Sequence, residues 1–191
     1  MNKWVHHKKL LCFKHLTAFG VAVILLTACG STRRATHTSP NPKPSAASAA
    51  SALKTKYAKL LGVPAQALTN TALYTFIDQW INTPYLYGGQ TKKGMDCSGF
   101  THLLFATVYG KSIARQSAAQ SLLVKTPKSM ADLAEGDLVF FKTEGSKTIN
   151  HVGLYLHNQK MISATTSAGV TISDIGSSYW KPKYVMGGSV K

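Results

Sequence analysis

The stretch Met-Asp-Cys-Ser-Gly-Phe at residues 95–100 constrains this chain most, because it places a single thiol, Cys97, where a helix is predicted to begin. Apolar side chains follow at the spacing of one helical face, and Gly110 supplies a stop. Asp96 is then the N-cap and Cys97 lies in the first turn. Unpaired backbone N–H groups and the helix dipole favour an anion there, which lowers the pKa of a thiol. The sequence thus predicts a nucleophile at Cys97; the alternative is a buried, inert cysteine that packs as a small hydrophobic residue.

The N-terminus has the pattern of a bacterial export signal. Four lysines precede an apolar run at residues 16–28 that is short for a membrane span, and Leu-Thr-Ala-Cys at residues 26–29 resembles a lipobox. We therefore expect residues 1–28 to be a lipoprotein signal peptide and Cys29 to be the lipidated first residue of the mature protein. Gly30 follows it instead of Asp, which implies an outer-membrane anchor in a bacterium with two membranes. An ordinary secretory signal with an incidental cysteine is the alternative.

Cysteine usage favours a reactive role for the remaining thiol. Cys12 leaves with the signal and Cys29 is used by the lipid, so the mature domain contains only Cys97 and no internal disulfide. A lone thiol in an oxidising compartment is a liability unless it is buried or used.

The charge of the chain is strongly basic. The formal net charge of +15 includes four signal lysines, which leaves +11 on the mature chain. The basic residues are scattered, aromatic residues do not interleave with them, and no nucleic-acid motif is present. We interpret the charge as attraction to anionic envelope polymer or lipid head groups, with no nucleic-acid partner; a merely solvated lysine surface is the alternative.

The mature chain divides into a tether and one domain. Residues 29–65 are expected to hold the lipidated cysteine and a flexible tether, because the sequence up to about residue 55 is rich in Ser, Ala, Thr and Pro. Residues 66–191 form the domain. Within it, apolar residues at helical spacing predict an amphipathic helix over 73–81, with Thr69 or Asn70 as N-cap.

The second half of the domain changes to a strand pattern. A short helix is predicted over 115–123, and strands are predicted over 137–141, 151–156, 160–164, 170–173 and 184–190. Helices followed by a strand meander indicate an α+β fold with an antiparallel sheet. A hairpin centred on His157 would place His151 directly opposite Ser163.

A thiol nucleophile needs a base, and the base needs a group that orients its ring. His151 is the candidate base, because the other six histidines fall in the signal, the tether, the cysteine helix or a turn. The Ser163 hydroxyl could accept the Nδ1–H of His151. Zinc requires several ligands at short spacings and no such cluster is present, so we expect no metal and no cofactor. A Gly-x-Ser-x-Gly serine-hydrolase elbow is also missing from the sequence.

Several motifs resemble, in order and spacing, those of the NlpC family of cell-wall cysteine peptidases. They lie at residues 85–89, 94–100, 115–120, 136–141 and 151–155. The resemblance covers about residues 84–184. It implies a papain-like fold, with N-terminal helices packed on an antiparallel sheet, and hydrolysis of peptides in peptidoglycan.

The resemblance also implies roles for individual residues. Cys97 would be the nucleophile, with His151 as the base. Substrate-binding residues would line the cleft around them: Tyr85 beside the oxyanion, Asp96, Ser98 and Arg115. The expected protein is a monomer in the bacterial envelope, bound to the membrane through Cys29 and facing peptidoglycan as its partner.

Two positions depart from the family pattern. Ala114 stands where a proline is usual, and Ser163 stands twelve positions after the base, where the family normally has a larger polar residue, most often histidine. A serine hydroxyl is short and uncharged, so it should orient the ring less firmly and stabilise imidazolium less. One alternative is therefore a catalytically weakened peptidoglycan-binding or regulatory lipoprotein on the same fold. Another alternative is a transferase. Permuted acyltransferases of this superfamily place His before Cys, whereas here Cys97 precedes His151, which counts against this alternative.

Overall fold

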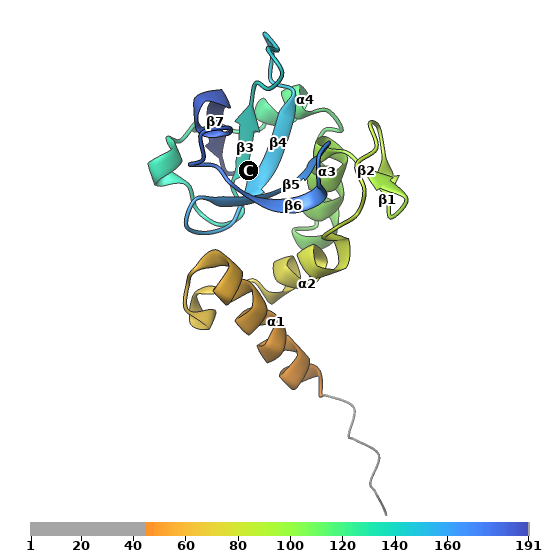
Figure 1. Ribbon diagram of the computed structural model, residues 1–191, viewed down its shortest axis with the longest axis vertical. Coiled ribbons are helices and arrows are strands. Elements are labelled where there is room, and N and C mark those ends of the chain that lie inside the picture. Colours follow the sequence, from red (N-terminus) through yellow and green to blue (C-terminus); the bar gives the residue numbers. More distant parts are fainter. Residues whose placement is uncertain (1–44, 191) are drawn as a thin grey trace, which may run out of the picture. The chain divides into compact units, whose positions relative to one another are not determined.

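The computed structural model describes residues 45–190 of the 191-residue chain (Figure 1). The predicted signal peptide, Cys29 and residues 30–44 lie outside the described residues. The helices are α1 (Ala46–Leu61), α2 (Thr71–Trp80), α3 (Cys97–Val108) and α4 (Ser117–Ser121). The strands are β1 (Gln90–Thr91), β2 (Gly94–Met95), β3 (Leu138–Phe141), β4 (His151–Tyr155), β5 (Lys160–Thr165), β6 (Gly169–Asp174) and β7 (Tyr184–Gly188). No helix of this part of the chain combines the length and apolarity needed to cross a bilayer.

The predicted tether over 29–65 is wrong from Ala46 onward, because α1 occupies most of that range. Ser45 caps the helix by accepting a hydrogen bond from the Ser48 amide, and Gly62 ends it in a left-handed conformation at φ +66°. Alanine is the best helix former, although the composition here resembles that of a linker. Tyr57 is fully buried on this helix, with its ring centroid 5.4 Å from that of Tyr74 in α2.

The predicted α+β class is confirmed. Strands β3 to β7 form one five-stranded antiparallel sheet in the order β6-β5-β4-β3-β7. Helix α3 lies along β4 and β5, and its buried Phe100 and Leu104 share a core with Val152 and Ile162 of the sheet (Figure 1). This packing holds the start of α3 near the start of β4.

The opposite face of the sheet has a smaller core of its own. It is made of Val139, Phe141, Tyr155, Met161, Ile175 and Trp180. His151 belongs to this face, because it pairs with Phe141 across the β3–β4 ladder and lies against Trp180. The site therefore lies at one end of the sheet, where the first residue of β4 comes near the first residue of α3.

The predicted register of the β4–β5 hairpin is wrong by two residues. Leu154 pairs with Ile162 and Tyr155 with Met161, so the turn centres on Asn158 and not on His157. Asn158 adopts a left-handed backbone at φ +47°, which suits the middle of a tight turn. A shift of two residues keeps every side chain on its face, so His151 and Ser163 remain neighbours, but diagonally.

Candidate active site

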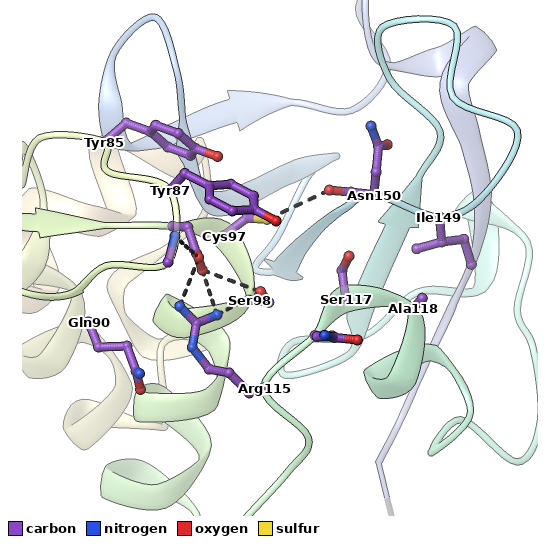
Figure 2. Close-up of a pocket in the computed structure, with 13 residues that line it drawn as sticks. Tyr85, Tyr87, Gln90, Cys97, Ser98, Arg115, Ser117, Ala118, Ile149 and Asn150 are labelled. Atoms are coloured by element: carbon purple, nitrogen blue, oxygen red, sulfur yellow. Dashed lines mark hydrogen bonds and ion pairs between the residues drawn. The ribbon is translucent and has the colours of Figure 1, made fainter.

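The predicted helix start at Cys97 is confirmed by α3. Asp96 is the N-cap, and its Oδ1 accepts a hydrogen bond of 2.6 Å from the Gly99 amide. Cys97 follows as the first helical residue, with 7% of its surface exposed. Its Sγ lies 4.0 Å from the Asn150 carbonyl oxygen, at the junction with β4 (Figure 2).

The expectation of a lowered thiol pKa is wrong. Burial raises the pKa of Cys97, and the negative charge of Asp96 adds to that rise. The backbone N–H groups of Val152, Ser98 and Cys97 act in the opposite direction without cancelling it. The resting side chain is therefore a neutral thiol, which needs a base to become a nucleophile.

His151, the predicted base, lines the same cavity as the thiol. It is the first residue of β4, is 8% exposed, and lines a cavity of about 590 Å³ together with Cys97 and Tyr85. Its ring lies almost parallel to that of Trp180, with centroids 4.9 Å apart and an interplanar angle of 30°. Burial lowers the pKa of His151 to about 4, so the imidazole is neutral near pH 7 and free to take a proton.

The predicted contact between His151 and Ser163 is present, through a different ring nitrogen from the one expected. Nε2, and not Nδ1, lies 3.2 Å from the Ser163 Oγ. When Nε2 carries the hydrogen and donates it to Ser163, the lone pair of Nδ1 is available as the base. Ser163 is fully buried, so this hydroxyl is screened from water.

Tyr85 lines the same cavities as Cys97. Met95 holds it there, because its carbonyl accepts from the Leu86 amide at 3.2 Å and its amide donates to the Pro84 carbonyl at 3.0 Å. Burial raises the pKa of the Tyr85 hydroxyl, and the nearby Cys97 raises it further. The hydroxyl therefore stays protonated and available as a donor.

The three other predicted substrate-binding residues are bound mainly to one another. Arg115 donates two hydrogen bonds of 2.8 Å to Asp96, one to each carboxylate oxygen. It also donates to the Ser98 hydroxyl at 2.9 Å (Figure 2). Burial opposes ionisation of Asp96, yet Arg115 and the Gly99 and Gly88 amides keep its pKa below the usual range. These residues line a second cavity of about 630 Å³ on the other side of Cys97.

Gly99 is required where these groups converge. A Cβ atom at this position would come within 2.6 Å of the Gly89 carbonyl oxygen and 2.9 Å of an Arg115 nitrogen. The glycine thus lets the 85–89 loop and the guanidinium pack against the first turn of α3.

Sequence reasoning missed three residues that shape the site. Trp180 covers the His151 ring, and nothing in its spacing indicated this. Asn150 contacts the thiol through its carbonyl. Gln120 belonged to a matched motif without an assigned role; it is fully buried, accepts from Thr101 Oγ1 at 2.8 Å and donates to the Ser98 carbonyl at 3.0 Å.

No group of three or more His, Cys, Asp or Glu side chains within residues 45–190 is arranged to hold a metal ion. The chemistry available in the cleft is that of a thiol, an imidazole and hydrogen-bond donors. This set suits attack on a carbonyl carbon and proton transfer to a leaving group.

Comparisons with known proteins agree with this geometry. The chain is 32% identical over 169 residues to the murein DD-endopeptidase MepS/murein LD-carboxypeptidase of Escherichia coli K12, covering 88% of this chain and 87% of that protein. It is 39% identical over 113 residues to a probable endopeptidase NlpC homolog of Haemophilus influenzae, covering 59% of this chain and 58% of that protein.

A solved structure shows the same fold. It is an NlpC/P60 family protein of Bacillus cereus, with a TM-score of 0.57 and 27% identity, covering 64% of this chain and 40% of that one. The model of the NlpC/P60 family matches residues 82–189, more than half of the chain, and includes Cys97, His151 and Ser163. The chain therefore belongs to the NlpC/P60 family.

Proposed function

We propose that the chain is a peptidoglycan endopeptidase that hydrolyses amide bonds of cell-wall peptides through Cys97. The observation that carries the proposal is the shared cavity of Cys97 and His151, in a chain whose relatives are named as murein endopeptidases. The positive charge of the chain suits an anionic polymer.

The first half of the proposed reaction forms an acyl-enzyme. Nδ1 of His151 takes the thiol proton as the Cys97 sulfur bonds to the scissile carbonyl carbon. The Tyr85 hydroxyl and backbone N–H groups at the start of α3 stabilise the developing oxyanion. The C–N bond then breaks, and the imidazolium gives its proton to the leaving amine.

The second half returns the enzyme to its resting state. His151 takes a proton from water as the water oxygen attacks the thioester carbonyl. The C–S bond breaks, the sulfur regains the proton from the imidazolium, and the acid product leaves. Ser163 acts as a positioning residue that fixes the ring through Nε2 in both halves.

Digestion of purified sacculi tests the proposed activity. We expect the parent chain to release muropeptides, and Cys97→Ala and His151→Ala to release none, because each removes a reacting group. His157→Ala is the matched control, since this histidine lies in the β4–β5 turn and contacts Glu135 instead of the cleft. Near-UV circular dichroism checks that each variant is folded.

Equal release by Cys97→Ala and the parent would disprove the nucleophile assignment. A parent chain that binds sacculi without releasing fragments would instead favour the alternative, a peptidoglycan-binding or regulatory lipoprotein.

The pH dependence of the rate tests the buried state of the base. Only neutral His151 accepts the thiol proton, so kcat/KM should rise with pH through about 4, the lowered pKa of this residue. An exposed histidine would place this rise near its ordinary pKa of about 6.5. Measuring rates on a soluble muropeptide between pH 3 and 8 distinguishes the two positions of the rise. Far-UV circular dichroism checks that the protein stays folded over this range. A rise centred near pH 6.5 would contradict the role of burial.

Replacing Ser163 tests how firmly the serine orients the base. Ser163→Ala should lower kcat less than tenfold, because the hydroxyl is short and neutral, whereas losing a fully preorganised catalytic donor costs about 10²–10³. The substitution also removes an acceptor that stabilises imidazolium, which lowers the pKa of His151. The rise of kcat/KM should therefore move to lower pH. Ser173→Ala is the control, because this serine lines the same cavity without contacting His151. A loss of tenfold or more would show that serine is a full substitute for the family's usual residue.

We also propose that Cys29 is lipidated and anchors the protein in the outer membrane, facing the periplasm. The support is the match of residues 26–29 to the lipobox, together with Gly30. The sixteen residue steps from Cys29 to Ser45 span at most roughly 55 Å, which keeps the domain beside the membrane surface.

Membrane fractionation tests the anchor. Cys29→Ala should move the protein from the membrane to the soluble fraction, because stable anchoring needs two or more acyl chains and all of them depend on this residue. Cys12→Ala, a cysteine outside the lipobox, is the matched control and should leave the protein with the membrane. Retention of Cys29→Ala at the membrane would disprove the lipid anchor.

A further inference from the structure

Most of the carboxylates of this basic chain are paired with a basic side chain. The chain has seven Asp and Glu residues, and all of them lie within the described part. Four form ion pairs with lysine or arginine: Asp78, Asp96, Asp137 and Asp174. Glu135 contacts Tyr74 and His157, and the exposed Asp132 contacts Ser129.

Of the two carboxylates without an ion pair in the described part of the chain, Asp132 and Glu144, only Glu144 lines a cavity of the cleft. Within residues 45–190 it forms no ion pair, and its hydrogen-bond donor is the Tyr179 hydroxyl, 3.0 Å from Oε1. Lys183 lies 3.7 Å from the centroid of the Tyr179 ring and donates to the Tyr179 carbonyl instead. Glu144 therefore keeps its charge available to a ligand.

The backbone places Glu144 in a conformation that glutamate seldom adopts. Glu144 and Gly145 have φ values of +52° and +69°, and the Ser146 amide donates to the Thr143 carbonyl at 2.9 Å, which defines a type I′ turn. This turn favours Asn, Asp or Gly at the position of Glu144, so glutamate is there at some cost in backbone strain. Such strain points to a role for the side chain.

Asn150 fixes the base of this turn. Its Oδ1 accepts from the Thr143 amide at 2.8 Å, and its Nδ2 donates to the Thr143 carbonyl at 3.1 Å. Asn150 directly precedes His151, so the turn that carries Glu144 is tied to the base. The loop between β3 and β4 projects beyond the sheet at this end (Figure 1).

Glu144 lies in the half of the cleft that receives the leaving group. The cavity of about 590 Å³ includes both Glu144 and His151, whereas the cavity of about 630 Å³ includes neither. In the proposed mechanism His151 protonates the leaving amine. The leaving side of the substrate is therefore assigned to the cavity of about 590 Å³, which contains His151. In the other half, the charge of Asp96 is neutralised by Arg115. Glu144 is thus the uncompensated negative charge among the residues lining the two cavities.

We propose that Glu144, held by Tyr179, forms a subsite for a primary ammonium group on the leaving side of the cleaved bond. Diamino acid residues of cell-wall peptides carry such groups when their second amine is free. The cavity that Glu144 lines suits a polar ligand, because more than half of its lining side chains carry hydroxyls, among them Thr165, Thr166, Ser167, Thr171, Ser173 and Tyr179. The inference rests on the proposed endopeptidase function and specifies what that enzyme selects.

Chemical acetylation of sacculi tests the subsite, because it removes free ammonium groups and leaves the peptide bonds unchanged. The full chain should release muropeptides from native sacculi faster than from acetylated sacculi. Glu144→Gln should lower the native rate roughly two- to fivefold, as expected for an exposed charge-assisted contact, and should abolish the preference. Asp132→Asn, the same charge change on an exposed residue outside both cavities, should retain the rate and the preference.

The outcomes separate this inference from the function on which it rests. A parent chain that cuts both substrates equally, or a Glu144→Gln variant that keeps the parental preference, would overturn the ammonium subsite alone. A folded parent chain that cuts neither substrate would overturn the proposed function, and the subsite with it. Equal losses in Glu144→Gln and Asp132→Asn would show a general effect of charge and would also overturn the subsite.

Discussion

Five hydrogen bonds converge on the carboxylate of Asp96, and through them one side chain connects three segments that are far apart in sequence. It caps α3 through the Gly99 amide, holds the 85–89 loop through the Gly88 amide, and binds both terminal nitrogens of Arg115. Because the cap fixes where α3 begins, it also fixes the thiol of Cys97 against the cleft. A buried carboxylate is stable here because its charge is paired and its oxygens are satisfied.

Burial determines the protonation states of the Cys97 thiol and the His151 imidazole. Burial raises the pKa of Cys97 and lowers the pKa of His151, so both shifts oppose a resting thiolate–imidazolium pair. Both shifts favour a neutral thiol and a neutral imidazole at rest. A neutral Ser163 beside Nε2 is consistent with this arrangement, because a neutral imidazole needs only a hydrogen-bond acceptor and no counter-charge.

The two cavities of the cleft differ in charge because different residues line them. On one side a carboxylate is neutralised by a bidentate arginine, so this wall offers polarity without net charge. On the other side the wall is lined by hydroxyls, the His151 and Trp180 rings and the Glu144 carboxylate. The two cavities beside Cys97 therefore present different electrostatic environments.

Local sequence patterns were sufficient for much of the fold and for part of the site. The Asp96 cap, the start of α3, the α2 helix and the five strands all follow from spacing and turn residues, because these signals act within a few residues. The pairing of Cys97 with His151 was predicted from the strand position of this histidine, and the motif resemblance implies the same pair. Composition alone gave the wrong prediction at α1. A Ser- and Ala-rich segment is typical of a linker, but here it forms a helix that buries Tyr57 against the domain.

The sequence by itself determined where the candidate residues lie: Cys97 at a helix start, His151 at the start of a strand, and Ser163 twelve residues later. Only the tertiary structure decided their state and their neighbours. The direction of the Cys97 pKa shift depends on burial, which overrides the helix-start N–H groups. The Trp180 ring and the Glu144 carboxylate reach the cleft from separate loops, because packing across the sheet brings together residues that no local period relates.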